Sequence, residues 1–391
     1  MSATTSTRPR PTFAALAAWL ILGPGPATAA EEASARVEVI RAPEGGIQPQ
    51  AVADRRGTIH LISFRGDPSH GDLSYARRDP GRPEFTRAIR VDPEPGSAVA
   101  TGTIRGGQVA LGRGGRVHVA WNGSRPGMHS EAPMFYARMK AGGDGFEPRR
   151  NLMRLTAGLD GGGTVAADDA GRVYVAWHAR GAGDPEGEAH RKLWVARSDD
   201  DGATFAVERP AIATATGACA CCGTRALVGS DGALSVLYRA ATGGEGRDLW
   251  RLTSRDGGAH YEGRPLHPWR INACPMSSAS MADGPDGPVA AWETAGQVYY
   301  ARASASAPAP TSPPGEPGGR KHPSVAVAPD GSTLLAWTEG TGWQKGGALA
   351  WRLFDASGRP TETSGRVEAG IPTWSLPTVV ARPDGGFTII H

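Results

Sequence analysis

The chain has 391 residues, of which 21% are charged, and its formal net charge at pH 7 is +3. This near-neutral balance gives no reason to expect nucleic acid or an acidic membrane as a partner. Glycine and proline number 55 and 32. They are spread evenly between short apolar runs, which is typical of turns that join many short strands.

The N-terminus, "MSATTSTRPRPTFAALAAWLILGPGPATAA", has the pattern of a secretory signal: a basic start, an apolar run from Phe13 to Leu22, and an A-x-A site at 27–29. We therefore expect residues 1–29 to be a signal peptide and residues 30–391 to form one secreted or periplasmic domain. Loss of Arg8 and Arg10 would lower the formal charge from +3 to +1. A retained membrane anchor is the alternative, but the run is much shorter than the roughly 20 residues that span a bilayer. The rest of the chain has no apolar stretch of that length, so we expect no membrane span in the mature chain.

The rest of the chain is an internal repeat. "GRVHVAW" (115–121) and "GRVYVAW" (171–177) are nearly the same peptide, and five related peptides begin at glycines 57, 232, 287, 331 and 385. Successive glycines are 58, 56, 61, 55, 44 and 54 residues apart. An apolar-alternating segment precedes each glycine, so each unit predicts a strand, a tight turn and a second strand. A third strand follows in most units, marked by "YAR" or "VAR".

A period near 55 residues with about four short strands predicts an all-β fold, a β-propeller of small sheets around a central axis. The last unit has only two strands before His391, and the segment "ARVEVIRA" (35–42) could complete it by pairing the two chain ends. This predicts seven blades. A six-bladed ring with an extra hairpin is the alternative.

The repeat also predicts which residues gather on one face. In a propeller, the loop into each innermost strand and the end of the following strand meet at the same face, which we call the mouth. Ligands of propellers usually bind there, where loop residues converge. Polar, charged and aromatic side chains at these positions are the candidates for ligand binding: Arg105, Asp160, His178, Arg225, Arg239, Glu293, His322 and Trp374.

The four cysteines also fall at these positions. Cys219 and Cys274 each stand 13 residues before a repeat glycine, so the segment "CACC" (219–222) and Cys274 should be neighbours on adjacent blades. In an exported protein this predicts disulfides, with Cys274 joined to one cysteine of the cluster. The alternative is a copper or zinc site made by Cys219, Cys221, Cys222, Cys274 and Met276.

Two segments match a known turn motif. "SDDDGATF" matches the Asp-box pattern S-x-D-x-G-x-T-[FW] at Ser198, Asp200, Gly202, Thr204 and Phe205. "SRDGGAHY" matches it in part, at Ser254, Asp256 and Gly258. Through these boxes and the period, the chain resembles the sialidase (neuraminidase) superfamily, known for its BNR repeats, over nearly all of the mature sequence.

The resemblance implies an exo-α-sialidase-like glycoside hydrolase that needs no cofactor. In such enzymes three arginines bind the substrate carboxylate, a tyrosine beside a glutamate is the nucleophile, and an aspartate is the acid/base. By position alone, Arg105, Arg225 and Arg239 would be the arginines, Tyr238 with Glu293 the nucleophile pair, and Asp160 the acid/base. The family's early Arg-Ile-Pro motif is absent from the first blade, where "GGIQPQAVAD" stands.

Three function classes remain open from the sequence. The first is a hydrolase or lyase that acts on extracellular glycans, with a carbohydrate as its ligand. The second is a binding propeller without catalytic activity. The third is a periplasmic copper- or redox-linked protein that uses the cysteines.

Overall fold

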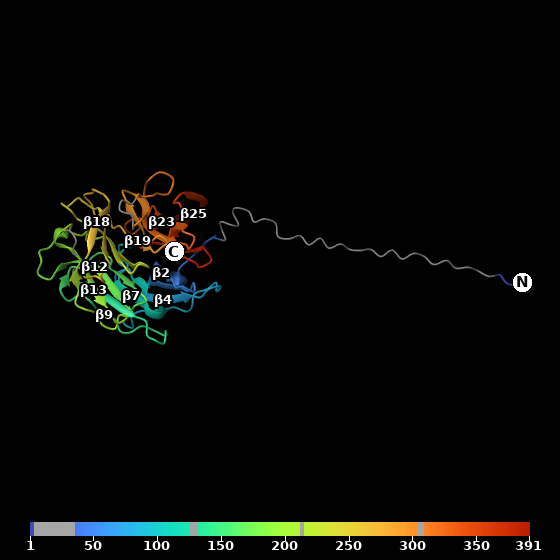
Figure 1. The fold of residues 1–391 in the computed structure, drawn as a ribbon, viewed down its shortest axis with the longest axis horizontal. Helices are drawn as coiled ribbons and strands as arrows, with labels where there is room; N and C mark the ends of the chain where they lie inside the picture. Colours follow the sequence, from blue (N-terminus) through green and yellow to red (C-terminus); the bar gives the residue numbers. More distant parts are fainter. Residues whose placement is uncertain (4–35, 125–131, 212–214, 304–308) are drawn as a thin grey trace.

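The computed structural model describes residues 1–3, 36–124, 132–211, 215–303 and 309–391. The predicted signal peptide, residues 1–29, lies almost entirely outside these ranges. Seven small sheets follow one another around a central axis, and the last of them, which contains the C-terminus, comes back beside the first, which contains β2 (Ile47–Ala53; Figure 1). The prediction of a seven-bladed propeller is confirmed, and the six-bladed alternative is not the observed fold.

The blades follow the chain order. Blade 1 contains β2 (Ile47–Ala53), β3 (Ile59–Arg65), β4 (Asp72–Arg78) and β5 (Ile89–Arg90). Blade 2 contains β6 (Gln108–Leu111), β7 (Val117–Asn122), β8 (Met134–Arg138) and β9 (Arg150–Asn151). Blade 3 contains β11 (Thr164–Ala167), β12 (Val173–Gly181), β13 (Lys192–Ser198) and β14 (Arg209–Pro210), and β10 (Thr156–Ala157) pairs with the end of β12.

Blade 4 contains β15 (Arg225–Val228), β16 (Leu234–Arg239), β17 (Leu249–Ser254) and β18 (Glu262–His267). Blade 5 contains β19 (Ala279–Ala282), β20 (Val289–Thr294) and β21 (Gln297–Arg302). Blade 6 contains β22 (Arg320–Val327), β23 (Thr333–Glu339), β24 (Gly347–Phe354) and β25 (Pro360–Ile371). Blade 7 contains β26 (Thr378–Ala381), β27 (Phe387–Ile390) and β1 (Val37–Ile40). Short 3-10 turns lie between strands, and those within the described residues are η1 (Pro43–Gly45), η2 (Arg113–Gly115) and η4 (Glu188–His190).

The glycines of the repeat form the tight turns between the first and second strands. All seven have a positive φ, between 76° and 97°, which L side chains rarely adopt and glycine adopts freely. These turns fix where each hairpin reverses, so the repeat in the sequence becomes a repeat in the structure. The glycines are Gly57, Gly115, Gly171, Gly232, Gly287, Gly331 and Gly385.

The ring is closed by the N-terminal strand, as the sequence predicts. β1 pairs in parallel with β27, with Val37 opposite Phe387 and Ile40 opposite Ile390. Arg78 of blade 1 donates two hydrogen bonds to the Glu38 carboxylate, at 2.7 and 2.6 Å, and this ion pair fastens β1 to the first blade. The two ends of the chain thus hold the first and last blades together.

The core lies between neighbouring blades. Trp121, Trp177 and Trp292, the tryptophans of the "VAW" and "AAW" repeats, are fully buried. Burying one tryptophan removes about 150–250 Å² from water, which stabilises the fold by roughly 4–6 kcal/mol. Tyr238 occupies the equivalent place in blade 4 and packs among Leu234, Val236 and Leu252.

The turn after β13 is held by hydrogen bonds among residues of the segment "SDDDGATF" (198–205). Asp200 accepts hydrogen bonds from Ser198 Oγ (2.7 Å) and from the Thr204 amide (2.8 Å). Ser198 Oγ accepts one from the Gly202 amide at 2.9 Å. Two equivalent bonds follow β17. Ser254 Oγ donates to Asp256, and the Gly258 amide donates to Ser254 Oγ. These residues therefore fix a turn at the outer part of the blade, away from the axis.

Candidate functional site

The loops that lead into the innermost strands meet around the axis at the mouth. In five blades, one non-glycine residue in this loop or at the start of the innermost strand has a positive φ, between 47° and 71°. Such backbone strain costs about 1–3 kcal/mol per residue and is concentrated at functional sites. These residues are Gln48, Thr103, Met276, His322 and Trp374.

The axis is nearly closed behind these loops. The space there has a volume of about 40 Å³, and its walls include Gln48, Thr103, Ser278 and Leu376. Ligand pockets for drug-sized molecules are usually about 300–1,000 Å³. A ligand of the mouth would therefore lie on its surface, because the space behind the mouth loops is too small to hold a drug-sized molecule.

Several side chains connect one blade to the next, among them the predicted site residues His178 and Glu293. Each stands in the second strand of its blade and bonds to the segment that enters the following blade. Asn122 of β7 donates to the Gly161 carbonyl at 3.0 Å, and His178 of β12 donates through Nε2 to the Cys222 carbonyl at 2.8 Å. Glu293 of β20 accepts from the His322 amide at 2.8 Å. These side chains thus hold neighbouring blades in register.

Arg239 is the most extensively bonded member of this group. It is 3% exposed, and its guanidinium donates to Ser277 Oγ at 3.1 Å, to the Arg247 carbonyl at 2.8 Å and to the Glu293 carbonyl. It also lies over the Trp269 ring, 4.8 Å from its centre. In the described part of the chain, no carboxylate forms an ion pair with Arg239. Burial lowers the pKa of its guanidinium.

Burial also shifts the titration of the two predicted histidines. It lowers the pKa of His178 to about 4 and that of His322 to about 3. Both side chains are therefore neutral at neutral pH. The Nδ1 atom of His178 has no hydrogen-bond partner in the described part of the chain.

The three predicted catalytic residues bond to other partners and not to one another. The Tyr238 hydroxyl is bonded to Thr216 Oγ1 at 2.7 Å, and burial raises its pKa. Glu293 is 3% exposed, and burial raises the pKa of its carboxyl. Asp160 is the accessible one: its side chain is 40% exposed and forms an ion pair with Arg105 at 2.5 Å. The structure thus brings Arg105 to Asp160, while Tyr238 contacts a residue other than Glu293.

The cysteines gather beside the mouth, between blades 4 and 5. Cys221 and Cys274 form a disulfide, which confirms that Cys274 bonds to the cluster. Cys219 and Cys222 are free and buried, with 3.3 Å between their sulfur atoms. Burial would raise the pKa of Cys222, but hydrogen bonds with Cys219 and Ser277 and the charge of Arg239 outweigh it and lower this pKa to about 7.

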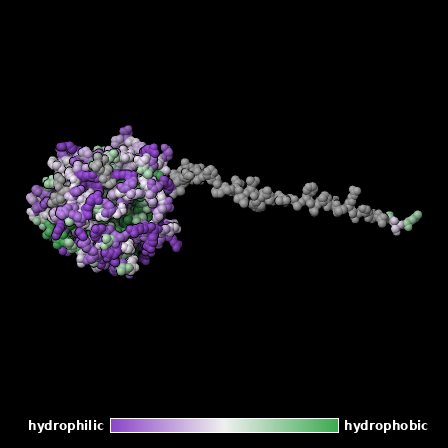
Figure 2. Space-filling view, viewed as in Figure 1, coloured by the Kyte–Doolittle hydropathy of each residue, from purple (hydrophilic) through white to green (hydrophobic). Residues whose placement is uncertain are grey.

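A pair of tryptophans marks the mouth between blades 6 and 7. Trp343, in the loop after β23, is 61% exposed, and its ring meets the Trp374 ring edge-on with 4.7 Å between the centres. The visible face of the molecule is largely hydrophilic (Figure 2), and few large apolar side chains are exposed in the described residues. The repeat pattern predicted Trp374 but not Trp343, although an aromatic residue in the glycine-rich loop "EGTGWQKGG" (339–347) is a usable signal.

The largest space along the axis lies at the end opposite the mouth. This cavity has a volume of about 540 Å³, and most of its wall is aliphatic, with Val109, Leu111, Val165 and Leu227. Arg225 borders both this cavity and the small space behind the mouth, and it donates to Gln50 Oε1 across the axis at 2.9 Å. Burial lowers its pKa to about 10, and no carboxylate of the described residues pairs with it.

We expect Arg225→Met to stabilise the protein. A buried charge without a partner is costly, and replacement of buried ionic groups by apolar ones often raises stability by about 1–4 kcal/mol. Chemical denaturation should show this increase, whereas Arg56→Met, on the exposed rim of the cavity, should change the unfolding free energy by no more than about 0.5 kcal/mol. A clear loss of stability in Arg225→Met would mean that its bond to Gln50 outweighs the cost of burial.

Comparison with known proteins identifies the fold. No family model and no curated protein matches the sequence. Among solved structures, an α-L-arabinofuranosidase of Fusarium graminearum in complex with an iminosugar inhibitor aligns with a TM-score of 0.55 and 11% identity, over 82% of this chain and 98% of that one. A Hadza microbial sialidase aligns with a TM-score of 0.52 and 14% identity, over 82% and 71%.

An α-L-arabinanase of Penicillium chrysogenum complexed with arabinobiose gives a TM-score of 0.52 and 12% identity, over 82% of this chain and 98% of that one. At such low identities, the likeness establishes the β-propeller fold alone. It assigns no activity to this chain, because unrelated functions share the fold.

In the described part of the chain, no helix has the length and apolar character needed to cross a membrane.

Proposed function

We propose that the protein binds glycans on the surface of its mouth, with Trp343 as the main contact. The observation that carries the proposal is the exposure of Trp343 beside Trp374, because tryptophan, with its apolar ring and polar N–H, is enriched at binding surfaces. The C–H face of a sugar ring is apolar and stacks well on such a surface, while its hydroxyls stay hydrated.

Charged groups lie in the same part of blade 6. Glu339, at the end of β23, accepts a hydrogen bond from Arg366 Nε at 2.9 Å, and Arg320 lies 3.5 Å from its other oxygen. The exposed part of Arg366 provides donors for sugar hydroxyls or for a carboxylate. The similarity in fold to sugar-acting propellers supports the proposal without deciding it.

The proposal concerns binding rather than hydrolysis. The narrow space behind the mouth and the buried position of Glu293 leave little room for a sugar between two carboxylates. Most glycosidases use two such groups on opposite sides of the bond, about 5–10 Å apart. The tyrosine–glutamate pair of a sialidase is not formed either, because the Tyr238 hydroxyl is bonded to Thr216. Hydrolysis by Asp160 and Glu293 stays a prediction of the sequence, as do export of the chain and its periplasmic or secreted location.

Trp343→Ala is expected to reduce glycan affinity at least tenfold. An exposed tryptophan at the centre of a binding surface commonly contributes 2 kcal/mol or more, and about 1.4 kcal/mol is a factor of ten. The measurement is a glycan array with the wild-type protein, followed by titration calorimetry on the best ligand.

Val207→Ala is the matched control. Val207 is another large apolar side chain that is exposed, and it lies just before β14 at the outer part of blade 3. Its loss should leave affinity unchanged. Binding that survives Trp343→Ala undiminished, or a wild-type protein that binds no glycan on a broad array, would contradict the proposal.

A further inference from the structure

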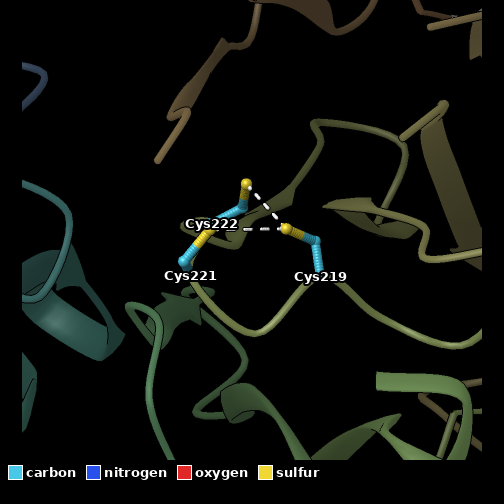
Figure 3. Close-up of side chains that lie close together, drawn as sticks. All are labelled: Cys219, Cys221 and Cys222. Carbon is cyan, nitrogen blue, oxygen red and sulfur yellow. Dashed lines mark hydrogen bonds between the residues drawn. The ribbon is translucent and has the colours of Figure 1, made fainter. Parts of the chain in front are cut away.

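Three cysteine sulfurs converge in one buried place beside the mouth (Figure 3). The Sγ atoms of Cys219, Cys221 and Cys222 all lie within 4.8 Å of one another. Cys219 is 3.6 Å from Cys221 and 3.3 Å from Cys222. Because Cys221 is bonded to Cys274, two thiols remain free at this point.

A methionine lies beside these two thiols. The Met276 side chain packs against the cysteine cluster and adds a thioether sulfur. The loop that carries Met276 is held in place by the Cys221–Cys274 bond, two residues away. Thiolate and thioether sulfur are the ligands that soft metal ions prefer.

A buried positive charge lies next to the thiols. Arg239 donates to Ser277 Oγ at 3.1 Å, and Ser277 Oγ in turn donates to Cys222 Sγ at 3.3 Å. The Arg239 carbonyl also accepts from the Cys219 amide at 2.9 Å. Buried charges are usually paired, yet no carboxylate of the described residues forms an ion pair with Arg239. A cluster of two thiolates and one monovalent cation has a net charge of −1, which would compensate this guanidinium.

We propose that Cys219 and Cys222 bind one Cu(I) ion, with the Met276 thioether as a third ligand. Zinc fits less well, because it takes four ligands in a tetrahedral arrangement and the disulfide leaves only two cysteines free. With metal–sulfur distances of roughly 2.3 Å, as in zinc thiolates, three sulfurs in a plane around a metal are about 4.0 Å apart. The observed separation of 3.3 Å needs only a small rotation of the side chains.

The test is a titration of the full-length protein with Cu(I), under anaerobic conditions, in competition with a chromophoric Cu(I) chelator. We expect one Cu(I) per chain. Cys219→Ser and Cys222→Ser should each weaken binding at least a hundredfold, and Met276→Leu about tenfold. The double variant Cys221→Ser/Cys274→Ser is the control, because it loses the disulfide, keeps all three proposed ligands and should still bind one ion.

Two further measurements keep the test independent of how well the variants fold. X-ray absorption of the wild-type complex should show two or three sulfur neighbours at roughly 2.3 Å. The intact mass of the protein, purified without reductant, should correspond to one disulfide. A mass that shows two disulfides, nitrogen or oxygen neighbours only, failure to hold Cu(I) against the chelator, or retention of zinc in its place would overturn the proposal.

Discussion

As the pH falls from 6.5 to 4.5, the protein is expected to lose several kcal/mol of unfolding free energy. Burial lowers the pKa of His118 and His178 to about 4 and that of His322 to about 3. The unfolded chain binds protons at these histidines below pH 6.5 and the folded protein does not, so protonation favours unfolding. Each histidine contributes about 1.4 kcal/mol per pH unit, or about 4 kcal/mol per unit for the three.

One group acts in the opposite direction. The pKa of Glu293 is raised, so its contribution to stability is present at low pH and is lost as the pH rises above the ordinary range of a glutamate. Near pH 4.5, this contribution offsets the loss of unfolding free energy from about one of the three histidines. Carboxylates with lowered pKa, such as Asp200 at about 2, add their own loss only at still lower pH.

Chemical denaturation at a series of pH values measures this loss. His118→Gln, which removes one buried imidazole, should reduce the slope by about 1.4 kcal/mol per pH unit, even if it lowers stability at neutral pH. His260→Gln is the control, because His260 is almost fully exposed and its loss should leave the slope unchanged. A stability that stays constant between pH 6.5 and pH 4.5 would show that these histidines are accessible to protons in the folded protein.

The second large effect concerns the disulfide between blades 4 and 5. Cys274→Ser should lower the unfolding free energy by about 4 kcal/mol, because the bond closes a long loop in the unfolded chain. The two cysteines are 53 residues apart in the sequence. The variant should also expose a new reactive thiol at Cys221.

Reductant provides the internal control. It should lower the stability of the wild-type protein by a similar amount and leave Cys274→Ser unaffected. If the wild-type protein is equally stable with and without reductant, the bond contributes little to the fold.

The sequence was most informative where local chemistry decides the structure. Seven turns need a positive φ, and glycine supplies it, so the repeat glycines predicted the blades and their order. The unfinished last unit predicted the pairing of Val37–Ile40 with the final strand. Equal offsets from the repeat glycines placed the cysteines on adjacent blades.

Side-chain direction was harder to predict. The offsets favoured Cys219 as the neighbour of Cys274, whereas the bond is made by Cys221, since counting locates a loop but not the way its side chains point. A polar residue after a second strand can face solvent or the next blade with the same sequence pattern. His178, Arg239 and Glu293 face the next blade, where unpaired backbone groups need partners.

The contacts of Trp343 depend on a distant segment. Its neighbour Trp374 belongs to the loop before the last blade, and only the packing of blades 6 and 7 brings the two rings together. The cavity around Arg225 likewise exists only after strands of several blades have closed around the axis.

The most direct test of glycan binding at the mouth is a crystal structure of the protein with an oligosaccharide selected on the array. The account predicts a sugar ring stacked on Trp343, with Trp374 beside it. A sugar bound in the cavity of about 540 Å³ at the opposite end of the axis, against Arg225, would contradict it.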